Sequence, residues 1–224
     1  PDVEARFEDS DSRPGWEPDT SVVIPEITRK GEAVALTPRN VLRSAVEAWE
    51  SHDMQPMVGI ELEASLFEHD GDGGWLPIST PGAHVYGTGL ADDTKGGIDE
   101  IMRISHKVGI PLESVNSEYD NGQFELTLAY RDAMTAADDA FLFKVMAKEI
   151  AARHGHMLTF MGKPITDRGG SGLHVNLSMA DGEGNNLLVD EDSDAGLPEL
   201  ARQMTAGMLN AHVGRGALMG ASIT

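Results

Sequence analysis

The sequence contains no cysteine, little positive charge and no long apolar run. Without cysteine the chain has neither disulfides nor thiolate metal sites, which fits a reducing cytoplasm. Seventeen Lys and Arg residues stand against 37 Asp and Glu residues, so the formal net charge is −20. A chain this acidic repels nucleic acid and anionic membranes. No apolar run approaches the roughly 20 residues that span a bilayer, and no signal-peptide pattern opens the sequence. We therefore expect a cytoplasmic protein without nucleic-acid or membrane partners.

The chain is long enough to bury a sizeable core in one or two domains, since 40% of its 224 residues are hydrophobic. Apolar residues at helical spacing predict helices over 37–54, 97–109, 131–155 and 197–214. Thr37 is expected to cap the first helix, with Pro38 in its first turn. The third helix is expected to bury an apolar face that consists of Ala137, Phe141, Leu142, Val145, Met146 and Ile150.

Strands are predicted where apolar and polar residues alternate. These segments are 21–24, 56–68, 157–164, 173–179 and a pair within 111–130 around an Asn121-Gly122 turn. Residues 68–97 are rich in Gly, Asp and Pro and are predicted to form a long loop. Hairpins and helices follow one another without regular βαβ order. The sequence therefore predicts an α+β fold with a largely antiparallel sheet backed by helices.

The segment GGSGLHVNLSM, residues 169–179, joins a flexible turn to an alternating strand. One face of that strand has the polar side chains of His174, Asn176 and Ser178, because side chains alternate along a strand. The other face is expected to contact a core through Leu173, Val175, Leu177 and Met179. Taken alone, this pattern also fits a half-exposed antiparallel strand after a turn.

Acidic residues repeat on the polar faces of the predicted strands. Glu61 and Glu63 lie two apart in GIELEASLF, and Glu118 and Glu125 flank the predicted turn. Neighbouring carboxylates repel one another, so a surface strand gains nothing from them unless a cation lies between them. Four carboxylates and the imidazole of His174 suit a hard divalent ion, Mg²⁺ or Mn²⁺, better than zinc. The alternative is that each glutamate is an ordinary solvated surface residue.

Four segments resemble the glutamine synthetase family in order and spacing. They are GIELE, SEYDNGQFE, ADDAFLFKVMAKEIAARHGHMLTFMGKP and GSGLHVNLS. The resemblance runs from about Pro38 to Thr224 and implies a fold of the glutamine synthetase catalytic-domain type. It implies that residues 1–36 are the end of an N-terminal β-grasp domain with its linker. Residues 37–224 then correspond to the N-terminal part of the catalytic domain, whose C-terminal part is absent.

The resemblance also implies roles for individual residues. Glu63, Glu118 and Glu125 match the ligands of one metal ion, and Glu61 and His174 match two of the three ligands of a second, which therefore lacks a ligand here. Gly169 and Gly170 match the loop beside the amino-acid substrate. No catalytic residue is assigned. Residues at positions that touch ATP are Glu113, Asn176, Ser178 and Tyr130, and the last of these needs its strand to bend.

Two departures from the family pattern concern substrate handling. Gly169 stands where the family usually has an asparagine that contacts glutamate, and Asn176 stands where it usually has a second histidine near the phosphates. Asparagine donates a hydrogen bond but has no positive charge. Both changes favour a relative that joins glutamate to an organic amine over one that uses ammonia.

The implied reaction joins glutamate to ammonia or an amine, with ATP as co-substrate and γ-glutamyl phosphate as the intermediate. We expect the chain to be part of a longer enzyme that forms a homo-oligomeric ring, and to be a poor catalyst alone. The alternatives are a non-catalytic scaffold of the same fold and an inactive fragment that only binds metal or nucleotide.

Overall fold

A six-stranded antiparallel sheet forms the centre of the molecule. The computed structural model describes residues 2–79, 85–87, 92–193 and 196–219. The longest strand, β6 (Gln55–His69), pairs along one edge with β9 (Gln123–Asp132), which in turn pairs with β8 (Leu112–Ser117). Along its other edge β6 pairs with β11 (Leu173–Ala180) and then with β10 (His156–Thr159). Short β7 (Trp75–Pro77) pairs with the end of β6. The predicted antiparallel α+β fold is confirmed.

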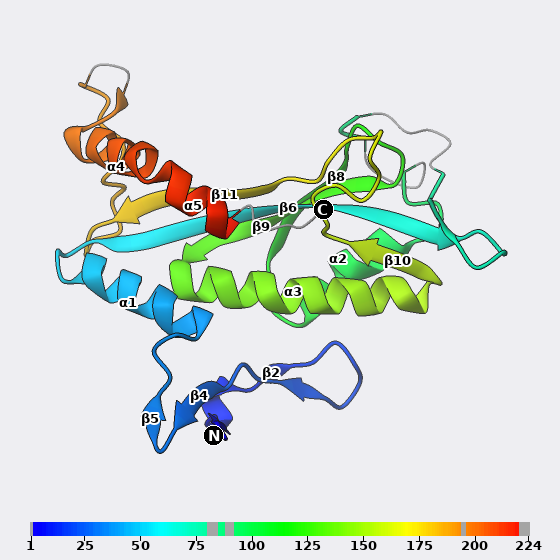
Figure 1. Ribbon diagram of the computed structural model, residues 1–224, viewed down its shortest axis with the longest axis horizontal. Coiled ribbons are helices and arrows are strands. Elements are labelled where there is room, and N and C mark those ends of the chain that lie inside the picture. Colours follow the sequence, from blue (N-terminus) through cyan, green and yellow to red (C-terminus); the bar gives the residue numbers. More distant parts are fainter. Residues whose placement is uncertain (1, 80–84, 88–91, 194–195, 220–224) are drawn as a thin grey trace.

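Three helices cover one face of this sheet, as Figure 1 shows. They are α1 (Pro38–Glu50), α2 (Gly97–Lys107) and α3 (Ala133–Arg153). Thr37 caps α1 by accepting a hydrogen bond from the Asn40 N–H, as predicted. Leu62, Leu66 and Leu126 of the sheet are buried with Met146 and Ile150 of α3 in one hydrophobic core. Truncating such a side chain to alanine typically costs about 2–5 kcal/mol of stability. The opposite face of the sheet holds the polar residues of the candidate site.

The buried face of α3 differs from the predicted one at an aromatic residue. Phe143 is fully buried, whereas Phe141, expected in the core, is 59% exposed. Phe141 lies beside Ile24 and Leu42 in a groove between α3, α1 and the N-terminal segment. Around Asp138 and Asp139 the helical spacing of apolar residues allows more than one choice of buried face. The buried face of α3 in the structure includes Asp139 itself.

The turn between β8 and β9 requires a glycine. Its backbone closes through hydrogen bonds from the Glu118 N–H to the Gln123 carbonyl (2.8 Å) and from the Gln123 N–H to the Asp120 carbonyl (2.9 Å). Gly122 has a φ of +75°, and a Cβ there would lie 2.8 Å from the carbonyl oxygen of Leu66. Any side chain would meet both a strained backbone conformation and the neighbouring strand. The predicted Asn121-Gly122 turn is thus confirmed as a longer loop that packs on β6.

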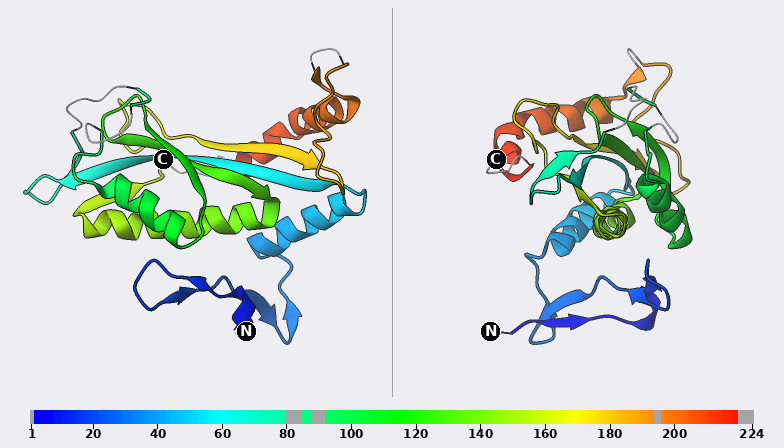
Figure 2. Two further views of the ribbon diagram at one scale, coloured as in Figure 1. Left: turned by 180° about the vertical axis from the view of Figure 1, so that it is seen from behind. Right: turned by 90° about the vertical axis from the view of Figure 1, so that its right-hand side faces the viewer.

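The N-terminal segment forms a small layer on the far side of α3 from the sheet (Figures 1 and 2). A three-stranded sheet joins β1 (Glu4–Arg6), β4 (Glu26–Arg29) and β5 (Glu32–Ala33). A short 3-10 helix (Asp9–Asp11) precedes β2 (Arg13–Pro14), which pairs with β3 (Ser21–Val22). Only the strand at 21–24 was predicted here, because the other strands are too short to show alternation.

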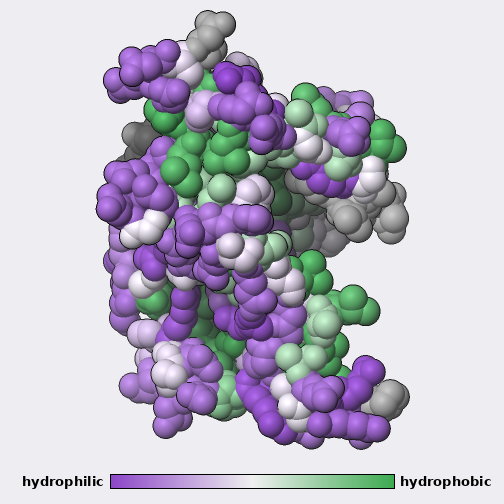
Figure 3. Space-filling model, turned by 90° about the vertical axis from the view of Figure 1, so that its left-hand side faces the viewer, coloured by the Kyte–Doolittle hydropathy of each residue, from purple (hydrophilic) through white to green (hydrophobic). Residues whose placement is uncertain are grey.

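The C-terminal region contains two helices where one was predicted. Helix α4 (Glu199–Asn210) is followed by Ala211 as its C-cap and then by α5 (His212–Met219). Leu200 and Met204 of α4 face Trp49, Pro56 and Met179 across an open apolar groove. On the side of the molecule that bears α4 and α1, hydrophobic residues gather near α4 within a mostly hydrophilic surface (Figure 3). None of the described helices is both long and apolar enough to cross a membrane.

Three further predictions are corrected. The strand expected over 157–164 ends at Thr159, because the chain turns there into the loop that leads to β11. The expected loop over 68–97 begins only after His69 and contains β7; its residues 80–84 and 88–91 lie outside the described part. Of the four apolar residues expected on one face of β11, only Met179 is buried, whereas Leu173, Val175 and Leu177 are 58, 51 and 41% exposed. These three side chains do not pack into a hydrophobic core of the described residues.

Candidate metal and nucleotide site

Three neighbouring strands place the predicted ligands on the open face of the sheet. Along β6 the buried residues alternate with Glu61 and Glu63, so both carboxylates face away from the helices. In the strand register, Glu61 lies opposite His174 of β11, and Glu63 lies opposite Glu125 of β9. Phe124 and Leu126 on the reverse face are buried, as predicted. The alternation of the sequence therefore brings these four ligand-type side chains together.

Glu61 is held by two neighbours on β11. Its Oε2 lies 2.9 Å from His174 Nδ1, and its Oε1 accepts a hydrogen bond from Asn176 Nδ2 at 2.8 Å. Glu61, Glu125 and His174 each offer one ligand atom, and these atoms all lie within 4.8 Å of one another. This group combines members of the two predicted ligand sets. Glu63 lies beside it, with its Oε2 accepting a hydrogen bond from Gln123 Nε2 at 3.1 Å.

Glu118 follows the last residue of β8 and belongs to the turn, not to a strand as predicted. Burial raises the pKa of Glu118, and the charges of Glu63 and Glu125 raise it further. Burial likewise raises the pKa of Glu125, and Glu61 and Glu63 add to the rise while His174 opposes it. Carboxylates that raise one another's pKa values in this way share one electrostatic environment. A bound cation would relieve that repulsion, so the donor set fits a hard divalent metal ion.

The four residues predicted to touch ATP line one pocket with Glu61. Glu113, Tyr130, Asn176 and Ser178 surround an open volume of about 310 Å³, and Gly59 lines it too. A Cβ at Gly59 would lie 3.5 Å from the Tyr130 Cβ and 3.8 Å from the Asn176 Cβ. A side chain larger than a methyl group at position 59 would extend into the space between Tyr130 and Asn176.

Two strand irregularities bring Glu113 and Tyr130 to this pocket. Simple alternation would place both on the face that the helices cover. The pairing of β8 with β9 shifts between Leu112 and Ser114, so Glu113 is an extra residue. The pairing of β6 with β9 shifts between Val58 and Ile60, which leaves an extra residue on β9 next to Tyr130. Such bulges redirect side chains. The bend that Tyr130 needed is therefore present.

The loop that contains Gly169, Gly170 and Gly172, called the glycine loop below, packs against the β8–β9 turn and against Glu63. The Gly169 N–H donates to the Asp120 carboxylate. A Cβ at Gly170 would lie 2.7 Å from the Gly162 carbonyl oxygen, and the Glu63 N–H donates to the Gly172 carbonyl at 3.1 Å. Backbone packing within the protein already requires glycine at position 170.

Gln123 is a residue of the site that the sequence did not single out. It is 4% exposed, and its Nε2 bridges Glu63 Oε2 at 3.1 Å and the Gly170 carbonyl at 2.8 Å. The amide therefore joins a predicted metal ligand to the glycine loop. The sequence could have indicated Gln123 only through its position two residues before Glu125, on the same face of β9.

Comparison with known proteins identifies the family of this chain. The family model "Glutamine synthetase, catalytic domain" matches residues 35–223. The chain belongs to the glutamine synthetase catalytic-domain family. Its similarity extends to a glutamate–isopropylamine ligase from a Pseudomonas species, with 33% identity over 87% of this chain and 44% of the relative. A glutamine synthetase from Halobacterium salinarum is 31% identical over 91% of this chain and 48% of its own length.

A solved structure described as apo GmaS without ligand superposes with a TM-score of 0.86 and 29% identity, over 97% of this chain and 52% of that one. The fold expected for the glutamine synthetase family is thus confirmed. This chain spans about half the length of the relatives that it matches. The roles of individual site residues remain predictions.

Proposed function

We propose that this chain forms part of an ATP-dependent ligase that joins glutamate to ammonia or an organic amine through γ-glutamyl phosphate. The observation that supports this best is the convergence of Glu61, Glu125 and His174 within 4.8 Å, beside a pocket lined by Tyr130 and Ser178. A metal-binding face next to a pocket of this kind suits phosphoryl transfer, which depends mainly on positioning and charge neutralisation.

The residues divide into three groups by the atoms that they offer. Glu61, Glu63, Glu118, Glu125 and His174 would hold Mg²⁺ or Mn²⁺, which would neutralise phosphate charge when bound. Glu113, Tyr130, Asn176 and Ser178 would line the nucleotide. Gly169 and Gly170 would border the amino-acid substrate. Asn176 donates to Glu61 Oε1, so we assign it the further task of orienting that carboxylate.

An organic amine is the acceptor that we favour. Asn176 and Gly169 replace residues that the family usually uses around phosphate and glutamate, and one relative is named a glutamate–isopropylamine ligase. We further propose that the whole enzyme is cytoplasmic and assembles as a homo-oligomeric ring. Residues 1–36 would then be the end of a β-grasp domain and linker, and residues 37–224 would belong to the catalytic domain.

The test is a Mn²⁺ titration of the chain and of a Glu125→Gln variant, with Glu47→Gln on the exposed side of α1 as the matched control. The substitution at Glu125 removes one ligand, so we expect the Mn²⁺ affinity to fall at least about tenfold, while the control keeps the original affinity. ADP should then raise the melting temperature further only when Mn²⁺ is present. A chain that binds neither Mn²⁺ nor ADP would favour the scaffold alternative.

A further inference from the structure

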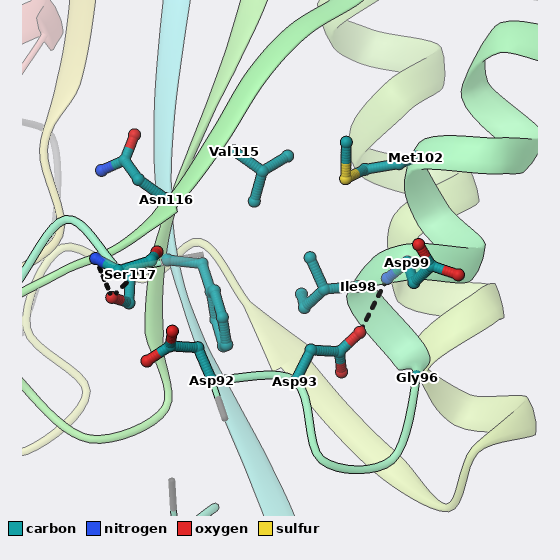
Figure 4. A pocket seen from close by; sticks show the side chains of 11 residues that line it. Asp92, Asp93, Gly96, Ile98, Asp99, Met102, Val115, Asn116 and Ser117 are labelled. Carbon is teal, nitrogen blue, oxygen red and sulfur yellow. Dashed lines mark hydrogen bonds between the residues drawn. The ribbon is translucent and has the colours of Figure 1, made fainter. Parts of the chain in front are cut away.

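A second pocket, of about 420 Å³, lies between the edge of β8 and the first turn of α2. Figure 4 shows that Val115 and Ser117 enter it from β8, while Ile98 and Met102 face it from α2. Its lining also includes Phe124 and three aspartates, Asp92, Asp93 and Asp99. The lining thus combines apolar side chains with three aspartates, and none of these residues belongs to the site described above.

Asp92 is the decisive residue of this pocket. Asp92 is only 4% exposed, and its Oδ1 is buried and has no hydrogen-bond partner among the residues that the structure describes. In Figure 4 the carboxylate projects into the space on the Ser117 side. Burying a carboxylate without a hydrogen bond or a counter-charge is strongly unfavourable. The protein therefore contains an acceptor site that a ligand with an N–H or O–H donor would complete.

The other two aspartates add negative charge and do not satisfy Asp92. Asp93 Oδ2 accepts the Asp99 backbone N–H at 2.8 Å, which holds Asp93 at the start of α2. The Asp99 side chain lies in the first turn of that helix. Among the described residues that line the pocket there is no lysine or arginine. The part of the pocket that the structure describes thus has an acidic end and no cationic side chain to neutralise it.

The geometry points to an organic cation and not to a metal ion. Among the described residues, the group whose ligand atoms converge for a metal is Glu61, Glu125 and His174, so the three aspartates do not converge in that way. The side chains of Ile98, Met102, Val115 and Phe124 offer an apolar surface that suits alkyl carbon. The unpartnered Oδ1 of Asp92 needs a hydrogen-bond donor, which a quaternary ammonium lacks.

We propose that this pocket binds a small primary alkylammonium ion, with its ammonium group on Asp92 and its alkyl chain against Ile98, Met102 and Phe124. The inference goes beyond the proposed ligase reaction and does not depend on it. The pocket nevertheless adjoins the candidate metal site. Asn116 lines the pocket, and the Nδ2 of Asn116 lies 3.5 Å from Glu118 Oε1.

The test is a thermal-shift and calorimetric titration of the chain with n-butylammonium chloride at constant ionic strength. Potassium chloride, tetramethylammonium chloride and 1-butanol serve as matched probes that lack, in turn, the alkyl chain, the N–H donor and the charge. We expect only butylammonium to raise the melting temperature, since it alone meets both the carboxylate and the apolar walls. An equal response to potassium or tetramethylammonium would overturn the proposal, and so would no response to butylammonium.

The variant Asp92→Asn tests the location. Losing a charged hydrogen bond should weaken butylammonium binding about tenfold or more. Asp192→Asn, an exposed position with the same change in net charge, should bind as the unmodified chain does. Unchanged affinity in Asp92→Asn would overturn the proposal, because the ion would then bind elsewhere. Mn²⁺ binding by the same variant reports on the ligase site separately, and the probe series on the unmodified chain decides the proposal even if Asp92→Asn does not fold.

Discussion

At the scale of single residues, the alternation of a strand was enough to identify the face on which Glu61, Glu63 and Glu125 lie. Glu61 and Glu63 flank buried Leu62 on β6, Glu125 lies beside buried Leu126 on β9, and the structure places the three carboxylates on one face as expected. Glu118 was less predictable, because a turn residue has no alternating face. The bridging role of Gln123 depends on the fold of a loop nearly 50 residues away, which no local pattern contains.

The first prediction concerns that glutamine. In Gln123→Met the side chain keeps its size, but Glu63 and the Gly170 carbonyl lose their shared donor. Residues that orient metal ligands typically contribute about 10–100-fold to metal affinity, so we expect a loss in that range for Mn²⁺. Gln55→Met, at the exposed start of β6, is the matched control. Calorimetric titration measures both variants, and equal affinities would show that Glu63 needs no such support.

At the scale of secondary-structure elements, the predictions succeeded where a pattern was long and failed where pairing is irregular. The helices α1, α2 and α3 were predicted because each repeats its apolar residues over several turns. The bulges beside Glu113 and Tyr130 were not, since an extra residue in one strand depends on the register of its neighbour. The early end of β10 at Thr159 was not predicted for a similar reason. After Thr159 the chain leaves the sheet and forms a loop in which the Ser171 N–H donates to the Gly162 carbonyl.

Strand β10 also begins with a histidine that links stability to pH. His156 is 3% exposed, and neither ring nitrogen has a hydrogen-bond partner among the described residues. Burial lowers the pKa of His156, and the charges of Lys95 and His154 lower it further, against Glu68 and Asp93. The folded state therefore holds this ring neutral at a pH where the unfolded chain binds a proton. Stability from this group is present above the unfolded pKa of about 6.5 and is lost as the pH falls through and below it.

Replacing His156 with phenylalanine should remove that dependence. We expect the unfolding free energy of His156→Phe to fall less than that of the unmodified chain between pH 7.5 and pH 5.5. Glu118 and Glu125 act in the opposite direction, because their raised pKa values favour the folded state in acid, but both proteins share that contribution. Urea unfolding at several pH values gives the difference between the two chains. A difference that does not change with pH would contradict the assignment.

At the scale of the whole molecule, the fold class and the family followed from the sequence, whereas the docking of the N-terminal layer did not. That layer meets the helices through ion pairs between residues far apart in sequence. Arg43 contacts Glu26 at 3.0 Å, and Arg13 contacts Asp139 at 2.5 Å. In a chain with 37 acidic residues and few basic ones, composition cannot show which carboxylates take these arginines. The pairing depends on how two separate segments pack.

Asp139 of α3 forms a buried contact between the N-terminal layer and the helices. Its side chain is 2% exposed and lies between Arg13 of β2, at 2.5 Å, and Arg131 of β9, at 3.5 Å. Removing the charge in Asp139→Asn leaves two guanidinium groups without their counter-ion. A fully buried pair loses about 3–5 kcal/mol when one partner is removed. Both arginines are at least one-third exposed, so we expect a smaller loss, about 1–3 kcal/mol of unfolding free energy in urea.

A double-mutant cycle with Arg13→Gln separates docking from a local effect on α3. If the N-terminal layer is held through this pair, the two substitutions together should cost less than the sum of their separate losses, by at least about 0.5 kcal/mol. Added salt should reduce this coupling free energy only in part, because the carboxylate of Asp139 is shielded from solvent while the arginines are not. Strict additivity would mean that Asp139 serves α3 and Arg131 alone. The Arg43–Glu26 ion pair and the apolar contacts of Trp16 and Val22 would then hold the N-terminal layer in place.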